Sequence, residues 1–270
     1  MATAVFFHAH PDDEAIATGG TMALAHEAGH RVVLVFGTRG ECGEPVEGVL
    51  QPGEDLGDRR ALESQQAGVI LGAHRVAFLG YRDSGMMGEP TNDDPRCFWQ
   101  ADFDEAAERL ADLLHDEDAD LLTIYDDHGG YGHPDHIQVH RVGLEAARRA
   151  GVGRVFESTM NRDQIREAMS AAIEAGEADD ETIERAESLD DEDEPFGTPA
   201  DELTHAIDVR SMIDRKRRAM QAHASQIGPD SFFFAMDEPV FEQAFGTEWY
   251  IEHGTHRTGP PFGVALFDEG

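Results

Sequence analysis

Residues 3–37 read TAVFFHAHPDDEAIATGGTMALAHEAGHRVVLVFG and show the order of elements with which the chain begins. Residues 3–9 are an apolar run of strand length, and residues 31–37 form a second such run that ends in glycine. Between them lie a polar loop and a segment of helix length, residues 14–30. Short apolar runs bounded by polar or glycine residues are typical of buried strands. The segment therefore predicts a strand, a loop, a helix and a second strand.

The same alternation continues along the chain. Further helices are expected at residues 58–73, 103–118 and 135–151, and further strands at residues 74–81, 119–127 and 151–159. Strands that alternate with helices favour an α/β fold with a mostly parallel sheet and helices on both faces. We expect one domain over residues 1–270, because no linker divides the chain.

The later part of the chain differs in composition. Residues 174–194 read EAGEADDETIERAESLDDEDE, which is strongly acidic and poor in large apolar residues. We interpret residues 174–196 as an acidic insertion that forms a solvated helix or a mobile segment rather than a cation site. Residues 202–234 return to an amphipathic spacing that is typical of helices.

The charge of the chain excludes some partners. It has 55 acidic and 21 basic residues, a formal net charge of −34, and Lys216 is its single lysine. Such a surface repels nucleic acids and anionic membranes, so we expect neither as a partner. Two explanations of the acidity stay open: a cytosol of high ionic strength, or a GC-rich genome that favours arginine over lysine.

The cysteines and the N-terminus indicate the compartment. Cys42 and Cys97 are too few for a disulfide framework and are not spaced as a zinc site, which fits a reducing cytoplasm. The first residues lack a basic region, and their apolar run is too short for a signal peptide or a membrane span. A cytoplasmic protein is expected.

Two similar polar motifs follow two of the expected strands. HPDD occupies residues 10–13 and HPDH occupies residues 133–136. Ligands of such folds collect beyond the carboxyl ends of the strands, so the two loops are expected to meet over one crevice. Catalytic zinc commonly takes three ligands from histidine and carboxylate and leaves a position open. We predict one Zn²⁺ per chain on His10, Asp13 and His136, and another divalent metal such as Fe²⁺ is compatible with this set.

The neighbouring residues supply candidate catalytic groups. Asp12 lies beside a predicted ligand and suits a general base, while His133 would act as an imidazolium that assists the leaving amine. Asp135 could orient His133. Tyr131 lies among three glycines, where its hydroxyl could reach a substrate carbonyl.

A simpler interpretation competes with the metal site, because acids and histidines after a strand are often turn and N-cap residues. The second motif at an equivalent strand end favours the metal. His8 and His140 could each be a fourth ligand or support one. The remaining histidines singled out have no partner that the sequence indicates, and we assign them to the surface or the core: His115, His128, His205 and His223.

AHPDDE together with GGYGHPDH resembles the LmbE/PIG-L family of zinc-dependent de-N-acetylases, which implies a Rossmann-like fold. TRGE (38–41), RALESQQAGVILG (60–72) and KRRAMQAHASQ (216–226) also resemble family segments, and FLGYRDSGM (78–86) resembles in particular the sugar-inositol deacetylases of mycothiol synthesis. The resemblance covers most of residues 4–160 and that later stretch. Residues 174–194 and the region after 228 depart from it.

The resemblance also implies roles for single residues. His10, Asp13 and His136 match the metal ligands, Asp12 matches the general base, and His133 with Asp135 matches the charged pair beside the reacting carbonyl. The positions that match substrate contacts are Tyr131, Arg60 and Asp83. Arg60 and Asp83 follow from the resemblance alone.

These observations together predict a metal-dependent hydrolase that removes the N-acetyl group from a small amino-sugar substrate. One alternative is an amidase that acts on a thiol conjugate or another non-sugar amide through the same site. Another is a non-catalytic metal- or sugar-binding module, which the loss of Asp12 or His133 would have favoured. The oligomeric state is left open, and a homo-oligomer is compatible with the sequence.

Overall fold

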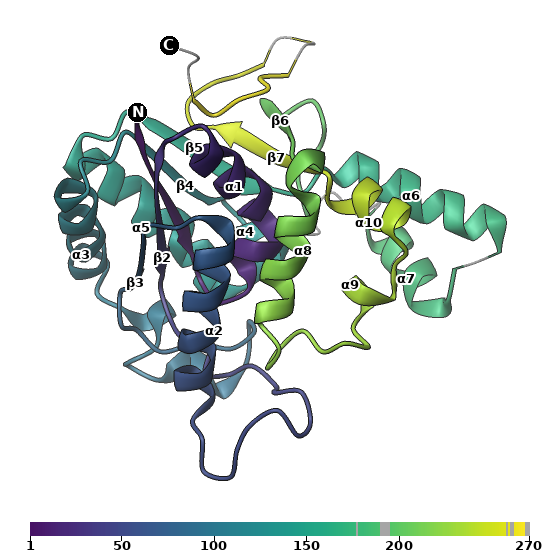
Figure 1. Cartoon of the computed structure of the whole chain (residues 1–270), viewed down its shortest axis with the longest axis horizontal. Coiled ribbons are helices and arrows are strands. Elements are labelled where there is room, and N and C mark those ends of the chain that lie inside the picture. Colours follow the sequence, from purple (N-terminus) through teal and green to yellow (C-terminus); the bar gives the residue numbers. More distant parts are fainter. Residues whose placement is uncertain (177, 190–194, 258, 260–261, 268–270) are drawn as a thin grey trace.

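The strands in the described part of the chain form one seven-stranded sheet, in the order β3-β2-β1-β4-β5-β7-β6 (Figure 1). The computed structural model describes residues 1–176, 178–189, 195–257, 259 and 262–267. Five neighbouring strands are parallel: β1 (Thr3–His8), β2 (Arg31–Phe36), β3 (Arg75–Phe78), β4 (Leu121–Tyr125) and β5 (Arg154–Thr159). β7 (Thr247–Glu252) pairs antiparallel with β5, and β6 (His205–Asp208) pairs antiparallel with β7. The prediction of a mostly parallel sheet is confirmed.

Helices cover both faces of the sheet, as expected. Phe7 and the other side chains that point to its face of β1 pack against α3 (Phe103–Asp116) and α5 (Pro134–Ala150). Phe6 points to the opposite face, which is covered by three helices: α1 (Gly19–Glu27), α2 (Leu56–Leu71) and α8 (Ile213–Ala222). Every residue of β1 and of β4 is buried, which explains why these strands read as continuous apolar runs.

The strand order places the two polar motifs together. β1 pairs with β2 on one side and with β4 on the other, and Val5 aligns with Val33 and with Leu122. The order of the strands reverses between β1 and β4, so the loops that leave their carboxyl ends diverge there and leave a crevice. The residues of HPDD follow β1, and those of HPDH follow β4.

The first helical segment differs from the expected single helix over residues 14–30. Residues Glu14–Thr18 form a π-helical turn, and α1 begins only at Gly19. Gly20 explains part of the local geometry, because a Cβ on it would lie 2.3 Å from the Cβ of Val209. The glycine therefore allows the chain before α8 to lie directly on α1.

Several short elements connect the main ones. They are α4 (Gly129–Gly132), α9 (Phe232–Ala235), α10 (Glu238–Phe245) and the 3₁₀ turns Pro90–Asp93, Phe98–Gln100 and Arg210–Met212. Among the described residues, no helix combines the length and the apolar character needed to cross a membrane.

The acidic stretch lies near two helices that project from the body of the molecule, α6 (Arg162–Ala175) and α7 (Asp180–Ser188) (Figure 1). α7 lies within the acidic stretch, where residues 183–188 are exposed or partly exposed and Leu189, directly after the helix, is buried. Residues 177 and 190–194 of the expected insertion lie outside the described residues.

The helical spacing expected over residues 202–234 is only partly right. Residues 205–208 form the edge strand β6, and the helix α8 spans only residues 213–222. Lys216 of α8 is buried and lies 2.6 Å from Glu248 of β7, whose carboxylate also accepts hydrogen bonds from the N–H groups of Gly20 and Thr21. The single lysine therefore joins α8 to β7 and to the start of α1.

Candidate active site

The predicted metal ligands meet in the crevice between the ends of β1 and β4. One carboxylate oxygen of Asp13, Oδ2, lies 3.5 Å from Nδ1 of His10 and 3.3 Å from Nε2 of His136. The same oxygen accepts a hydrogen bond of 2.9 Å from the backbone N–H of His10. Burial alone would raise the pKa of Asp13, but the rings of His136 and His10 hold it well below its usual range. The structure thus brings the three predicted ligands together around an ionised carboxylate.

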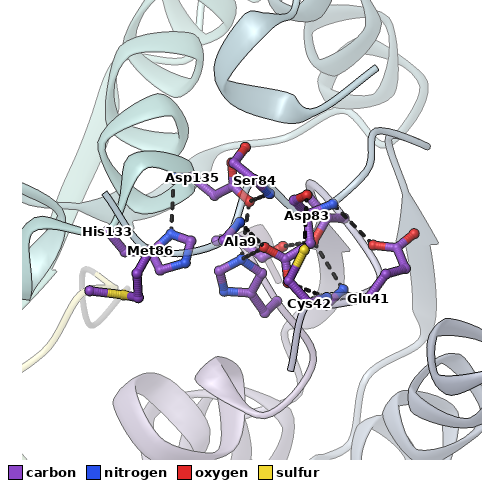
Figure 2. A network of polar contacts seen from close by, with 12 residues as sticks. Ala9, Glu41, Cys42, Asp83, Ser84, Met86, His133 and Asp135 are labelled. Carbon is purple, nitrogen blue, oxygen red and sulfur yellow. Dashed lines mark hydrogen bonds and ion pairs between the residues drawn. The ribbon is translucent and has the colours of Figure 1, made fainter. Parts of the chain in front are cut away.

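His10 is oriented by two carboxylates through its other ring nitrogen. Its Nε2 lies 3.1 Å from Oδ2 of Asp135 and 3.5 Å from Oδ1 of Asp83. Ser84 holds Asp135 in turn, because its backbone N–H donates to Oδ2 over 3.0 Å and its hydroxyl donates to Oδ1 (Figure 2). Burial would lower the pKa of His10, but Asp83, Asp13 and Asp135 raise it well above its ordinary value.

The contacts of Asp135 differ from those that its expected role suggests. Its carboxylate contacts His10 and Ser84, whereas its connection to His133 runs through its backbone N–H, which donates to Nδ1 of His133 over 3.1 Å. The reason is local: His133 is the N-cap of α5 and accepts an N–H of the first turn, while the Asp135 side chain faces the loop that carries Ser84. The side chain of Asp135 therefore contacts His10, and its backbone contacts His133.

The donor set fits a divalent metal. Two imidazoles and one carboxylate converge, and the outer nitrogen of His10 is bound by a carboxylate, an arrangement that is usual for histidine ligands of zinc. Two triads among the described residues have donor atoms that all lie within 4.8 Å of one another, and the predicted set is not one of them: His10, His133 and His136; and His10, Asp83 and Asp135. All of them include His10.

Asp12 has an unusual backbone and a shifted pKa. Its φ is 102°, in the left-handed region that few residues other than glycine adopt. Its backbone N–H donates to Oε2 of Glu14 over 2.9 Å, and its Oδ2 lies 3.3 Å from Nη2 of Arg60. Burial raises the pKa of Asp12 to about 6, and the positive charge of Arg60 opposes this rise. The carboxyl group can therefore take up and release a proton near neutral pH.

His133 lies beside His10 and His136, with ring centroids 4.6 and 5.2 Å away. Burial, with His10 and His136 beside it, lowers the pKa of His133 to about 3, so the imidazolium form is unfavourable. Because Nδ1 accepts the N–H of Asp135, the proton of the neutral ring lies on Nε2. His133 lines the cavity and can donate a hydrogen bond there as a neutral group.

Tyr131 lies at the rim of the cavity and is 39% exposed. Its hydroxyl lies 3.3 Å from Nε2 of His136, and burial raises the pKa of Tyr131 well above its usual value. The phenol therefore keeps its proton and remains a hydrogen-bond donor. Gly130, with φ of 76°, allows the turn that brings Tyr131 to this position.

One cavity of about 240 Å³ joins these groups. It is lined by His10, Asp12, Asp13, Cys42, Gly43, Arg60, Asp83, Gly85, Met86, Glu89, Tyr131 and His133. Arg60 and Asp83, which only the resemblance implied, thus lie in the wall of this cavity.

Arg60 and Asp83 are also tied into the protein. Arg60 is buried and donates to the backbone oxygens of Gly40 and Pro11. The carboxylate of Asp83 accepts the N–H groups of Cys42 and Gly85 over 3.1 and 2.8 Å. Both side chains are therefore rigidly placed in the wall of the cavity.

The other histidines do not join the candidate ligands. His8 uses both nitrogens, with Tyr125 Oη at 2.8 Å and Thr18 Oγ1 at 2.9 Å, and burial lowers its pKa to about 4. His140 lies 3.0 Å from the backbone oxygen of Tyr125. They support the site instead, because the ring of Tyr125 stacks on His136 with 4.2 Å between centroids.

The histidines without an expected partner divide between surface and core. His115 is exposed and His205 is buried. His128 is partly exposed and lies 3.2 Å from Asp126. His223 does have a partner, because it is fully buried and lies 2.6 Å from Glu14.

Sequence reasoning missed Ser84, Glu14 and Tyr125 as parts of the site. Ser84 lies in FLGYRDSGM and Glu14 is the last residue of AHPDDE, so both belong to segments that resemble the family, but neither had an assigned role. No local signal distinguished Tyr125 from the apolar residues of its strand.

Comparison with known proteins shows the family of the chain. Residues 5–147 match the model of the family described as "PIG-L: GlcNAc-PI de-N-acetylase". A 1D-myo-inositol 2-acetamido-2-deoxy-alpha-D-glucopyranoside deacetylase from Acidothermus cellulolyticus is 43% identical over 90% of this chain and 86% of its own. The enzyme of the same name from Thermobifida fusca is 38% identical over 94% of both chains.

Solved structures share the fold at low identity. N,N'-diacetylchitobiose deacetylase from Pyrococcus horikoshii aligns with a TM-score of 0.61 and 18% identity over 93% of this chain and 83% of that one. Teicoplanin deacetylase Orf2 aligns with a TM-score of 0.58 and 17% identity over 94% and 99%. Since the family model matches more than half of the chain and close relatives match nearly all of it, this protein belongs to the PIG-L family of de-N-acetylases.

Proposed function

We propose that this protein is a metal-dependent hydrolase that removes the N-acetyl group from an amino sugar. The observation that carries the proposal is that His10 and His136 converge on Asp13, and that His10, Asp12 and Asp13 line one cavity at the point where the strand order reverses. The names of the relatives support an N-acetylglucosaminyl-inositol as the substrate.

The metal would be held by His10, Asp13 and His136, and we propose Zn²⁺, with another divalent ion such as Fe²⁺ as the alternative. When bound, the ion would act as a Lewis acid that polarises the amide carbonyl and makes a water molecule more acidic. The protein's part is to hold the ligands, and Asp135 fixes the ring of His10 for this purpose.

The side chains around the ligands divide the proton transfers. Asp12 takes a proton from the attacking water and returns it to the nitrogen of the departing amine, which suits a carboxyl group with a pKa of about 6. Tyr131 donates its O–H to the carbonyl oxygen as negative charge develops there. Neutral His133 donates its Nε2–H to the reacting amide. Water is consumed, the C–N bond breaks, and acetate and a free amine form.

Arg60 and Asp83 are proposed to bind hydroxyl groups of the substrate, because a guanidinium and a carboxylate in the cavity wall offer a donor and an acceptor to a polyol. Arg60 has a second effect, since it also lies 3.3 Å from Asp12. Asp83 also lies 3.5 Å from Nε2 of His10, so substrate recognition is measured as the difference between two substrates at full metal occupancy.

The test compares an N-acetylglucosaminyl-inositol with a simple N-acetylated amine that lacks hydroxyls, with released amine as the signal. Asp83→Ala is expected to lower kcat/KM for the sugar by about 10- to 100-fold more than for the simple amine, as for a lost hydrogen bond to a charged group, with both rates compared at full metal occupancy. Arg60→Ala should impair both substrates. Arg59→Ala is the matched control, because Arg59 is the next residue of α2 but pairs with Glu54 away from the cavity.

Two results would refute the amino-sugar proposal. One is equal hydrolysis of the simple amine and the sugar by the unaltered protein. The other is an Asp83→Ala protein with unchanged kcat/KM for the sugar. Either would favour a general amidase.

We further propose a cytoplasmic enzyme with one domain over residues 1–270, which includes the acidic segment near residues 174–196. The two free cysteines, Cys42 and Cys97, support a reducing compartment. The net charge of −34 argues against nucleic acids and anionic membranes as partners, which leaves a small N-acetylated molecule as the expected ligand.

A further inference from the structure

The backbone conformation of Asp12 depends on Glu14. A φ of 102° is rare for a residue with a side chain and persists only where surrounding contacts hold it. The N–H of Asp12 donates to Oε2 of Glu14 over 2.9 Å. Its carbonyl accepts the N–H groups of Ala15 and Ile16 over 3.0 and 3.1 Å. The direction of the Asp12 carboxylate is therefore coupled to the position of the Glu14 side chain.

Glu14 is held from the far end of the chain by His223. Both side chains are fully buried, and Nε2 of His223 lies 2.6 Å from Oε1 of Glu14. Within the described residues, Nδ1 of His223 has no hydrogen-bond partner, so the contact with Glu14 is the one that anchors the ring. The Glu14 carboxylate thus accepts a hydrogen bond from the backbone N–H of Asp12 on Oε2 and contacts the His223 ring through Oε1.

The turn that carries His223 is itself fixed. His223 follows the last residue of α8, and two residues later the N–H and the hydroxyl of Ser225 donate to the buried carboxylate of Glu63 over 3.0 and 2.6 Å. Glu63 belongs to α2, the helix that also carries Arg60. Asp12 is therefore held on its backbone side by α8 and on its carboxylate side by α2.

We propose that His223 is a positioning residue for the deacetylation: acting through Glu14, it holds Asp12 in its left-handed conformation and directs the carboxylate into the cavity. This inference rests on the proposed role of Asp12 as the proton acceptor. It also gives His223, near the end of the segment KRRAMQAHASQ (residues 216–226), a part in catalysis although it is neither a predicted ligand nor a lining residue of the cavity.

The test uses two replacements of His223 that differ in reach. His223→Gln can place an amide N–H near the position of Nε2, whereas the shorter side chain of His223→Asn cannot reach Glu14. With N-acetylglucosamine as substrate, we expect the glutamine variant to keep kcat and the asparagine variant to lose about 10- to 100-fold in kcat, the scale of a misplaced catalytic group. KM and metal content should not change. Hydrogen exchange at the Asp12 amide, measured on the metal-free protein, should be faster in the asparagine variant alone.

Lys216→Met is the matched control for a purely structural effect. Lys216 lies on the same helix and makes an equally short and buried ion pair with Glu248, but Glu248 holds Gly20 and Thr21 rather than Asp12. The control should lower Tm and leave kcat unchanged.

Three outcomes would overturn the inference. They are equal kcat in the two His223 variants, unchanged kcat and amide exchange in His223→Asn, or a loss of kcat in Lys216→Met as large as in His223→Asn. If Asp12→Ala is inactive in the same assay, the proposed function survives these results. An active Asp12→Ala protein would overturn both.

Discussion

Replacing Asp135 by asparagine is expected to weaken metal binding rather than to act through His133. The carboxylate is fully buried, and its Oδ2 faces two donors, the Nε2–H of His10 at 3.1 Å and the N–H of Ser84 at 3.0 Å. Asparagine keeps the shape but must present its amide NH₂ either to these donors or to the hydroxyl of Ser84. In the first orientation His10 loses the acceptor that fixes its ring.

The magnitude follows from what remains around His10. Loss of such a carboxylate partner typically costs 10- to 100-fold in metal affinity, or about 1.4 to 2.8 kcal/mol. Asp83 Oδ1 lies 3.5 Å from the same nitrogen and can accept part of its hydrogen bond. We therefore expect a loss of about tenfold for Asp135→Asn, a smaller one for Asp83→Asn, and about 100-fold when both are changed.

The assay is a titration of metal-free protein with Zn²⁺ in competition with a chelating dye, with Tm measured to establish that each variant is folded. Asp83→Asn serves as the matched control, because it also removes a charge beside His10. Wild-type affinity in Asp135→Asn, or a larger effect of Asp83→Asn, would refute the view that Asp135 orients the ligand.

Three further predictions concern catalysis and stability. Asp12→Ala should keep its metal and lose about 100-fold or more in kcat, whereas Asp13→Ala should lose the metal, as measured by elemental analysis. Identical behaviour of the two variants would contradict the assignment of Asp12 as base and Asp13 as ligand. Because burial raises the pKa of Asp12 to about 6 and its carboxylate is the proton-accepting form, kcat should rise between about pH 5 and pH 7, and a flat profile would argue against Asp12. Tm should rise from low salt to molar potassium chloride, because salt screens the repulsion among 55 acidic residues that only 21 basic residues oppose. An unchanged Tm would favour codon bias as the origin of the acidity.

The sheet of the first 160 residues was predictable because its signals are local. Strands buried on both faces must be apolar along their whole length, and the helices between them carry a periodic apolar face, so the order of elements can be read from short windows. The second half offered no such regularity. β6 has four residues at the sheet edge, and an edge strand that short resembles the amphipathic segment around it. The pairing of β7 with β5 joins residues about 90 positions apart and has no local pattern at all.

The sequence by itself also determined the candidate site, because HPDD and HPDH combine the side chains that a metal and a proton transfer require, at the ends of two strands that the topology makes neighbours. Only the tertiary structure decided what each side chain faces. Asp135 is next to His136 in the chain but serves His10, 125 residues away, and His223 reaches Glu14 across 209 residues. Such contacts, and the pKa values that burial gives to Asp12 and His133, depend on how distant elements pack and exclude water, which no short stretch of sequence specifies.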